Sequence, residues 1–241
     1  MNKNHYLKKY ISESSKSLNL ILKTQNNKLN QAVDLFCKTY FNNGMIYIFG
    51  TGHSHMIAEE GHFRAGGFAP MCPILSSSTM LHESATFSSK IERTKGVASQ
   101  LLEKYNLTPN DIIIIASNSG VNQAPIEAAL YAKKKKTKII GISSLKYSNK
   151  ISKNKKLYQL SDIHIDNCGP RGDAIININK YKVAPFSTIG GVAIINSIIS
   201  EVAFKLREEN PFPFYISSNM PNSKLHNEKL FKKYRSRNPH L

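Results

Sequence analysis

Two stretches of the chain decide its fold: Met45-Ile46-Tyr47-Ile48-Phe49-Gly50-Thr51-Gly52-His53-Ser54 and Asp111-Ile112-Ile113-Ile114-Ile115-Ala116-Ser117-Asn118-Ser119-Gly120. Each runs from an apolar segment into a loop of small and polar residues. The second run is unbroken and β-branched, which is typical of a strand buried on both faces of a parallel sheet. We expect a helix behind each loop, over about residues 54–64 in the first case and directly after Gly120 in the second.

The rest of the chain continues this alternation. Further strands are expected at residues 71–75, 138–142 and 161–166, and helical spacing recurs over residues 97–105 and 187–206. Strands that alternate with helices need crossover connections, which predicts a mostly parallel sheet with helices on both faces.

The two ends of the chain differ from this pattern. Residues 6–40 carry apolar side chains at helical spacing with a polar break at residues 24–27, which predicts two helices ahead of the core. The end is polar and basic, with a short helix expected near residues 225–234. We therefore expect an N-terminal helical extension over residues 1–43, an α/β domain over 44–210 and a C-terminal extension over 211–241.

Composition narrows the class of protein. The 241 residues, 41% of them hydrophobic, suffice for one substantial core. No run approaches the roughly 18 consecutive apolar residues of a membrane-spanning helix, and the first residues lack a secretory apolar stretch. We expect a soluble, cytoplasmic protein without membrane partners. Cys37, Cys72 and Cys168 lie far apart without CxxC spacing, so neither a disulfide framework nor a thiolate metal site is indicated.

The net charge of +17 raises the question of nucleic acid, because a basic surface attracts phosphate whatever the sequence. The excess is mostly lysine spread along the chain. Its densest block, residues 133–136, falls at an expected helix end, where cations meet the negative end of the helix dipole. A nucleic-acid partner is therefore not expected, whereas attraction of anionic metabolites is compatible with this charge.

The two loops carry the chemistry. We call Gly50-Thr51-Gly52-His53-Ser54 the first loop and Ser117-Asn118-Ser119-Gly120 the second loop. Strand ends and helix starts meet at one edge of a parallel sheet, where backbone N–H groups and hydroxyls can hold a phosphate. The alternative is that Ser and Asn only cap helices and Gly closes turns. Two loops of like chemistry in the same topological position favour the phosphate site.

Three other sites are excluded by the residues. A Walker A loop needs Gly-Lys-Ser/Thr, which does not occur in the chain. A dinucleotide fingerprint needs a third glycine where His55 stands and an acidic residue where the next strand ends in Ser76-Ser77-Ser78. A serine-hydrolase elbow, Gly-x-Ser-x-Gly, fails at Met56.

With these two loops the chain resembles the sugar isomerase (SIS) domain family, over about residues 45–206, and is closest to stand-alone bacterial members of unassigned activity. The tail from residue 225 to residue 241 also looks like theirs. The resemblance implies a three-layer αβα sandwich with a five-stranded sheet and the binding of a phosphosugar.

The resemblance also implies particular residues. Ser54, Ser117 and Ser119 would hold the phosphate. Around them the other expected contacts are Gly52, His53, Asn118 and Asn122, the last standing where the family often has threonine. SIS proteins typically look like dimers or tetramers, so a homodimer or homotetramer is expected, and no cofactor is.

Family membership does not determine the reaction. SIS domains serve as aldose-ketose isomerases, as a phosphosugar ether lyase and as effector sensors in regulators. We expect an isomerase or a related enzyme. The sensor is disfavoured because the residues before Met45 are too few and lack the pattern of a helix-turn-helix domain. A non-catalytic phosphosugar-binding protein remains the alternative.

An isomerase needs a base that moves a proton between neighbouring carbons. Because the reacting carbons lie out from the sheet edge, the first choices are Glu60 and Glu83, and the second choices are His62 and His226. On a helix after the first loop, His55, Glu59 and His62 share a face and suggest a metal site. No cysteine or further carboxylate completes it, so no metal is expected.

Overall fold

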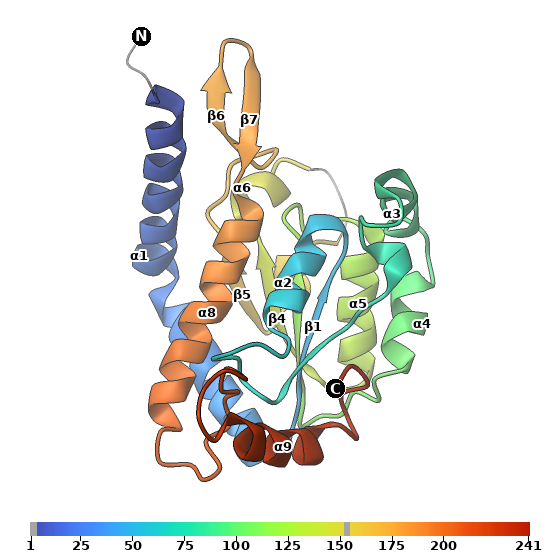
Figure 1. Ribbon diagram of the computed structural model, residues 1–241. Helices are drawn as coiled ribbons and strands as arrows, with labels where there is room; N and C mark the ends of the chain where they lie inside the picture. Colours follow the sequence, from blue (N-terminus) through green and yellow to red (C-terminus); the bar gives the residue numbers. More distant parts are fainter. Residues whose placement is uncertain (1–3, 152–154) are drawn as a thin grey trace.

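A computed structural model describes residues 4–151 and 155–241, and in it a five-stranded sheet lies between two layers of helices (Figure 1). The strands are β1 (Ile46–Gly50), β2 (Met71–Pro73), β3 (Ile112–Ala116), β4 (Lys138–Ser143) and β5 (Ile163–Asp166). Their order is β2-β1-β3-β4-β5, and every neighbouring pair is parallel. The predicted α/β sandwich with a parallel five-stranded sheet is confirmed.

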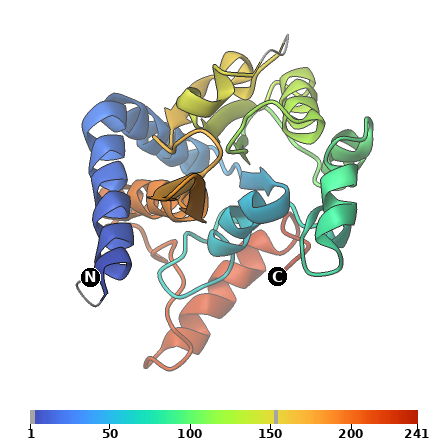
Figure 2. The same cartoon turned by 90° about the horizontal axis from the view of Figure 1, so that it is seen from above.

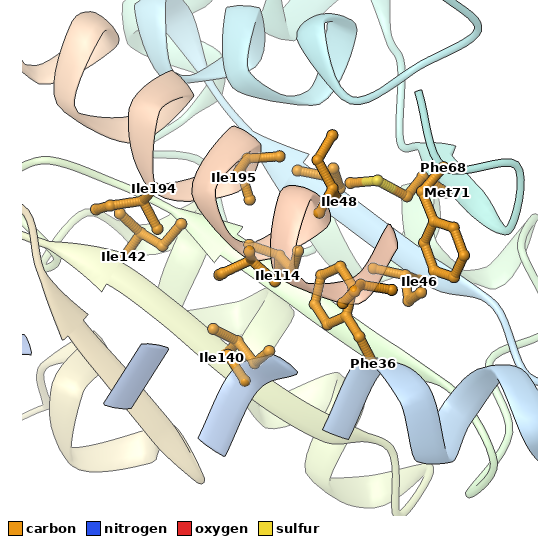
Figure 3. Close-up of a cluster of buried hydrophobic side chains, with 14 of the residues drawn as sticks. Phe36, Ile46, Ile48, Phe68, Met71, Ile114, Ile140, Ile142, Ile194 and Ile195 are labelled. Carbon is orange, nitrogen blue, oxygen red and sulfur yellow. The ribbon is translucent and has the colours of Figure 1, made fainter. Parts of the chain in front are cut away.

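Successive residues of the central strands contribute to opposite cores, as strand geometry requires. One core joins Ile48 and Ile114 to α1 (His5–Phe41), α2 (His55–Glu60) and α8 (Ser187–Lys205). Figure 3 shows Ile194 and Ile195 of α8 beside these strand isoleucines. The other core joins Tyr47, Phe49, Ile113 and Ile115 to α4 (Val97–Glu103), α5 (Gln123–Lys134) and α9 (Ser223–Tyr234). The strands are thus buried on both faces, which accounts for their unbroken apolar runs.

The N-terminal segment is one continuous helix, α1, and the prediction of two helices was wrong. The polar residues at the expected break have partners of their own. Gln25 Oε1 accepts a hydrogen bond from the backbone N–H of Asp166 (3.1 Å), and Thr24 Oγ1 donates to the carbonyl of Leu20 (2.8 Å). Contacts with the end of β5 therefore stabilise a helix that residue propensity alone would interrupt.

A two-stranded antiparallel hairpin, β6 (Ala174–Ile178) and β7 (Tyr181–Pro185), was not predicted. Its turn contains Asn179 in the left-handed region, at φ 52°. The hairpin projects past the carboxyl edge of the sheet beside the first half of α1 (Figure 1). Tyr10 donates a hydrogen bond to the carbonyl of Pro185 (2.9 Å), which ties the helix to the hairpin.

Helix α8 is the one helix in the described part of the chain that is long and apolar enough to cross a membrane by length and composition alone. Ile194, Ile195 and Ile198 on its inner face are buried in the core next to the sheet.

The C-terminal extension is anchored under the amino edge of the sheet. The guanidinium of Arg237 donates to both carboxylate oxygens of Asp111, at 3.0 and 2.7 Å. Asp111 is fully buried, and it also accepts hydrogen bonds from the backbone N–H groups of Met45 (2.7 Å) and Thr108 (2.7 Å). Asp111 thus links the starts of β1 and β3 to the tail. Farther on, Tyr105 and His240 share a hydrogen bond of 2.9 Å.

Replacing Arg237 by alanine should lower the free energy of unfolding by about 3 kcal/mol, because it removes one partner of a buried, hydrogen-bonded ion pair. Urea denaturation measures this change. Arg235→Ala is the matched control, since Arg235 lies two residues away and is exposed. Equal losses in the two variants would show that the ion pair does not anchor the tail.

Candidate functional site

The two loops lie side by side at the carboxyl edge of the sheet, which Figure 2 views from above. Strands β1 and β3 pair in parallel with Gly50 opposite Ala116, so both loops begin at the same level. After β1 the chain makes a 3-10 turn, η1 (Gly52–Ser54), and enters α2. A side chain at Gly50 would collide with the carbonyl of Ser54, so this tight turn requires glycine there.

The second loop is held by hydrogen bonds from three sides. Ser117 Oγ accepts from the backbone N–H of Gly120 (3.2 Å), and Ser148 Oγ donates to the carbonyl of Ser119 (2.6 Å). Asn118 Oδ1 accepts from Asn167 Nδ2 (3.0 Å) after β5. Gly120 has φ +65°, a conformation that favours glycine.

The structure therefore brings together the loop residues that the sequence singled out as phosphate contacts. Ser54, Asn118, Ser119 and Asn122 are partly exposed at this edge, and His53 is exposed. Ser117 is buried.

Glu92 connects the two loops, and sequence reasoning did not find it. Its carboxylate follows α3 (Ala85–Ile91) and accepts from Thr51 Oγ1 at Oε2 (2.9 Å) and from Asn122 Nδ2 at Oε1 (2.9 Å). The side chain is 15% exposed. Nothing in its sequence surroundings marks the residue, because its partners are distant in the chain.

A histidine–carboxylate pair lies at the start of α2. His55 Nδ1 donates to Glu59 Oε1 (3.1 Å), and the His55 side chain is 2% exposed. Its Nε2 is buried and has no hydrogen-bond partner among the described residues. Burial lowers the pKa of His55, against the opposing effect of Glu59.

His62 does not join this pair. Its ring lies 6.1 Å from that of His240 in the C-terminal tail, and burial lowers its pKa. The three residues that suggested a metal site are therefore divided between two places.

The other base candidates also lie apart. Glu60 pairs with Arg64 and accepts from Asn196 Nδ2 of α8 (3.0 Å). These residues line a cleft of about 550 Å³ between α2, α8 and residues 212–216. His226 on α9 donates from Nε2 to the carbonyl of Phe214 (2.8 Å).

Glu83 is exposed and belongs to the segment that passes the first loop. Leu81 of that segment packs over Gly52, at van der Waals distance from where a Cβ would lie. Among the four base candidates, Glu83 therefore lies in the segment that contacts the first loop.

A second cleft, of about 580 Å³, opens beside the second loop. It starts at Asn122 and has Arg93 and Lys155 on its walls. A ligand held at the loops has room here for a polar or anionic body.

Two comparisons decide the family. The model of the SIS domain matches residues 9–144. A UPF0309 protein of Brucella anthropi is 46% identical over 214 residues, which cover 88% of each chain. The chain is a SIS domain protein of the UPF0309 family. The resemblance inferred from the two loops is confirmed.

Solved structures agree with this fold. The chain is similar to a phosphoheptose isomerase from Francisella tularensis (TM-score 0.58, 12% identity, 84% of this chain and 98% of that chain). It is similar to an E. coli CFT073 protein in complex with a sugar phosphate (0.56, 12%, 88% and 96%). It is also similar to the Vibrio vulnificus NanR protein complexed with ManNAc-6P (0.54, 12%, 97% and 70%). At these identities the likeness shows a shared SIS fold.

His164 supports the second loop from behind. Its Nε2 shares a hydrogen bond of 2.8 Å with Ser143 Oγ, and its ring packs edge-on against Tyr158. A Cβ at Gly120 would lie 3.1 Å from the same Ser143 oxygen, so the imidazole and the loop share this neighbour. Burial, and to a smaller extent the positive charge of Lys28, lowers the pKa of His164 to about 4.

This burial predicts a loss of stability in mild acid. As the pH falls from about 6.5 toward 4, the unfolded chain binds a proton at His164 that the folded protein excludes, at a cost approaching about 3 kcal/mol. In urea denaturation across that range, His164→Gln should weaken the pH dependence, and His5→Gln, at an exposed position, should not. Parallel curves for wild type and His164→Gln would contradict the assignment.

Proposed function

We propose that this protein binds a sugar phosphate, with the phosphate between the first and second loops, and interconverts its aldose and ketose forms. One observation carries the proposal: the in-register pairing of Gly50 with Ala116 brings two Ser- and Gly-containing loops to one edge. Hydroxyls and backbone N–H groups at the start of helices are suited to an anion there. The contacts we propose are Ser54, Ser117 and Ser119, flanked by Gly52, His53, Asn118 and Asn122.

The relatives support a sugar phosphate as the ligand class. The chain is a SIS domain protein, and two proteins of similar fold were solved with sugar phosphates, one of them ManNAc-6P. The likeness to a phosphoheptose isomerase supports isomerase-like chemistry. For our chain, the net charge of +17 favours the approach of such an anion.

For the base we propose Glu83 first, because it belongs to the segment that passes the first loop. Glu60 is next. It faces a cleft large enough for a small ligand, although Arg64 already pairs with it. His62 and His226 remain second choices, since imidazole moves protons near neutral pH.

Phosphosugars should raise the apparent melting temperature, and the matching free sugars should not, because a ligand that binds only the folded state stabilises it. Ser54→Ala and Ser119→Ala should each weaken binding by about 1.5–3 kcal/mol, the range for hydrogen bonds to charged groups. Ser12→Ala, on the exposed side of α1, is the control. Equal shifts with sugars and sugar phosphates, or normal binding by both loop variants, would place the phosphate elsewhere.

Proton exchange tests the reaction. If Glu83 is the base, wild type should transfer solvent deuterium into a bound sugar phosphate, as followed by NMR, and Glu83→Gln should abolish the transfer without abolishing binding. Glu60→Gln tests the next candidate in the same way, and Glu228→Gln, exposed on α9, is the control. Exchange that survives both substitutions refutes both assignments. Binding without any exchange would point to a sensor or a lyase.

We also propose that two or more copies associate through α1. Leu7, Ile11 and Leu22 of this helix are 67%, 65% and 61% exposed, and their spacing places them along one side. A second copy would cover this apolar surface. Sedimentation at micromolar concentration should show a dimer or tetramer that Leu7→Lys/Ile11→Lys weakens. A wild-type monomer would contradict the proposal.

A further inference from the structure

Glu92 contacts both loops from a third segment of the chain. Besides the two carboxylate contacts, its backbone carbonyl accepts from the N–H of Ala124 in the first turn of α5 (2.9 Å). One residue thus makes one hydrogen bond to the first loop and two to the region that follows the second loop.

These contacts differ from an ordinary surface pairing. The guanidinium of Arg93 lies 3.2 Å from Glu92 Oε1, but its side chain is 58% exposed, and such pairs contribute little. Thr51 is buried, and each Glu92 oxygen has its own uncharged donor from a different loop region. Hydrogen bonds to a shielded carboxylate are among the stronger ones in proteins.

The side chain of Asn122 is committed to Glu92. Asn122 directly precedes α5, a position where asparagine commonly caps the helix with its own side chain. Here its side chain makes no such cap and donates to Glu92 instead. The second loop region is therefore tied to Glu92, and through it to Thr51, across the edge where we propose that the phosphate binds.

We infer that Glu92 is a positioning residue that holds the two loops at a fixed separation before any ligand arrives. The inference rests on the proposed function for its purpose, but the mechanical link is a property of the protein alone. A cradle assembled in advance spares the ligand the cost of ordering the loops, and this raises affinity.

Hydrogen exchange of the ligand-free protein tests the link. Glu92→Ala should speed amide exchange in residues 50–54 and in residues 117–122 together, by about tenfold or more, as expected for the loss of a hydrogen bond to a charged group. Glu92→Gln should restore protection, since its Oε1 can accept from Asn122 and its Nε2 can donate to Thr51 Oγ1. Thr51→Val, which cuts one side of the bridge, should loosen both loops as well.

Faster exchange confined to the segment around α3, or a Gln variant as loose as the Ala variant, would overturn the inference. A binding titration with inorganic phosphate then tests the consequence. Glu92→Ala should bind about tenfold more weakly than wild type, with Glu92→Gln at least as tight as wild type because it keeps the bridge and removes a negative charge.

Two results separate this inference from the proposed function. If wild type binds no sugar phosphate, the proposed function fails and the exchange data still decide whether Glu92 links the loops. If Glu92→Gln keeps binding and loop protection but abolishes proton exchange into a bound sugar phosphate, Glu92 acts on the reacting atoms. The positioning role is then overturned.

Discussion

The parallel hydrogen-bonding register of β1 and β3 is the constraint on which the rest of the protein depends. It aligns Ile46 with Ile112 at one end and Gly50 with Ala116 at the other. At the amino end, Asp111 and Arg237 anchor the tail across both strand starts. At the carboxyl end the same alignment brings the two loops to one level. A slip of one residue would move every strand side chain to the opposite core and separate the loops.

Much of the fold was predictable because its signals are local. The apolar runs of β1, β3 and β4 are interior strands, and the glycines after them mark turns into helices. Helix α1 was misjudged because the partners of its polar residues, such as the backbone of Asp166, lie far along the chain. The hairpin was missed because its strands lie outside the main sheet and are largely exposed, so they lack a buried face to mark them.

The site was predictable only in part, for the same reason. Ser, Asn and Gly next to strand ends are visible in the sequence, and they identified the two loops. Glu92 is one carboxylate in a polar stretch, and only folding brings it against Thr51 and Asn122. Glu60 and Glu83 could not be ranked from the sequence, since one faces α8 and the other lies in the segment beside the first loop. Long-range pairing therefore separates the predictable residues from the rest.

The central claim is that a phosphate group binds between the two loops. A crystal structure of the protein with a bound sugar phosphate tests it most directly. The account predicts phosphate oxygens within about 2.5–3.0 Å of the hydroxyls of Ser54 and Ser119, the distance of hydrogen bonds to an anion. A phosphate found instead in the cleft of Glu60 and Arg64, or on the surface lysines, with the loops empty, would contradict it.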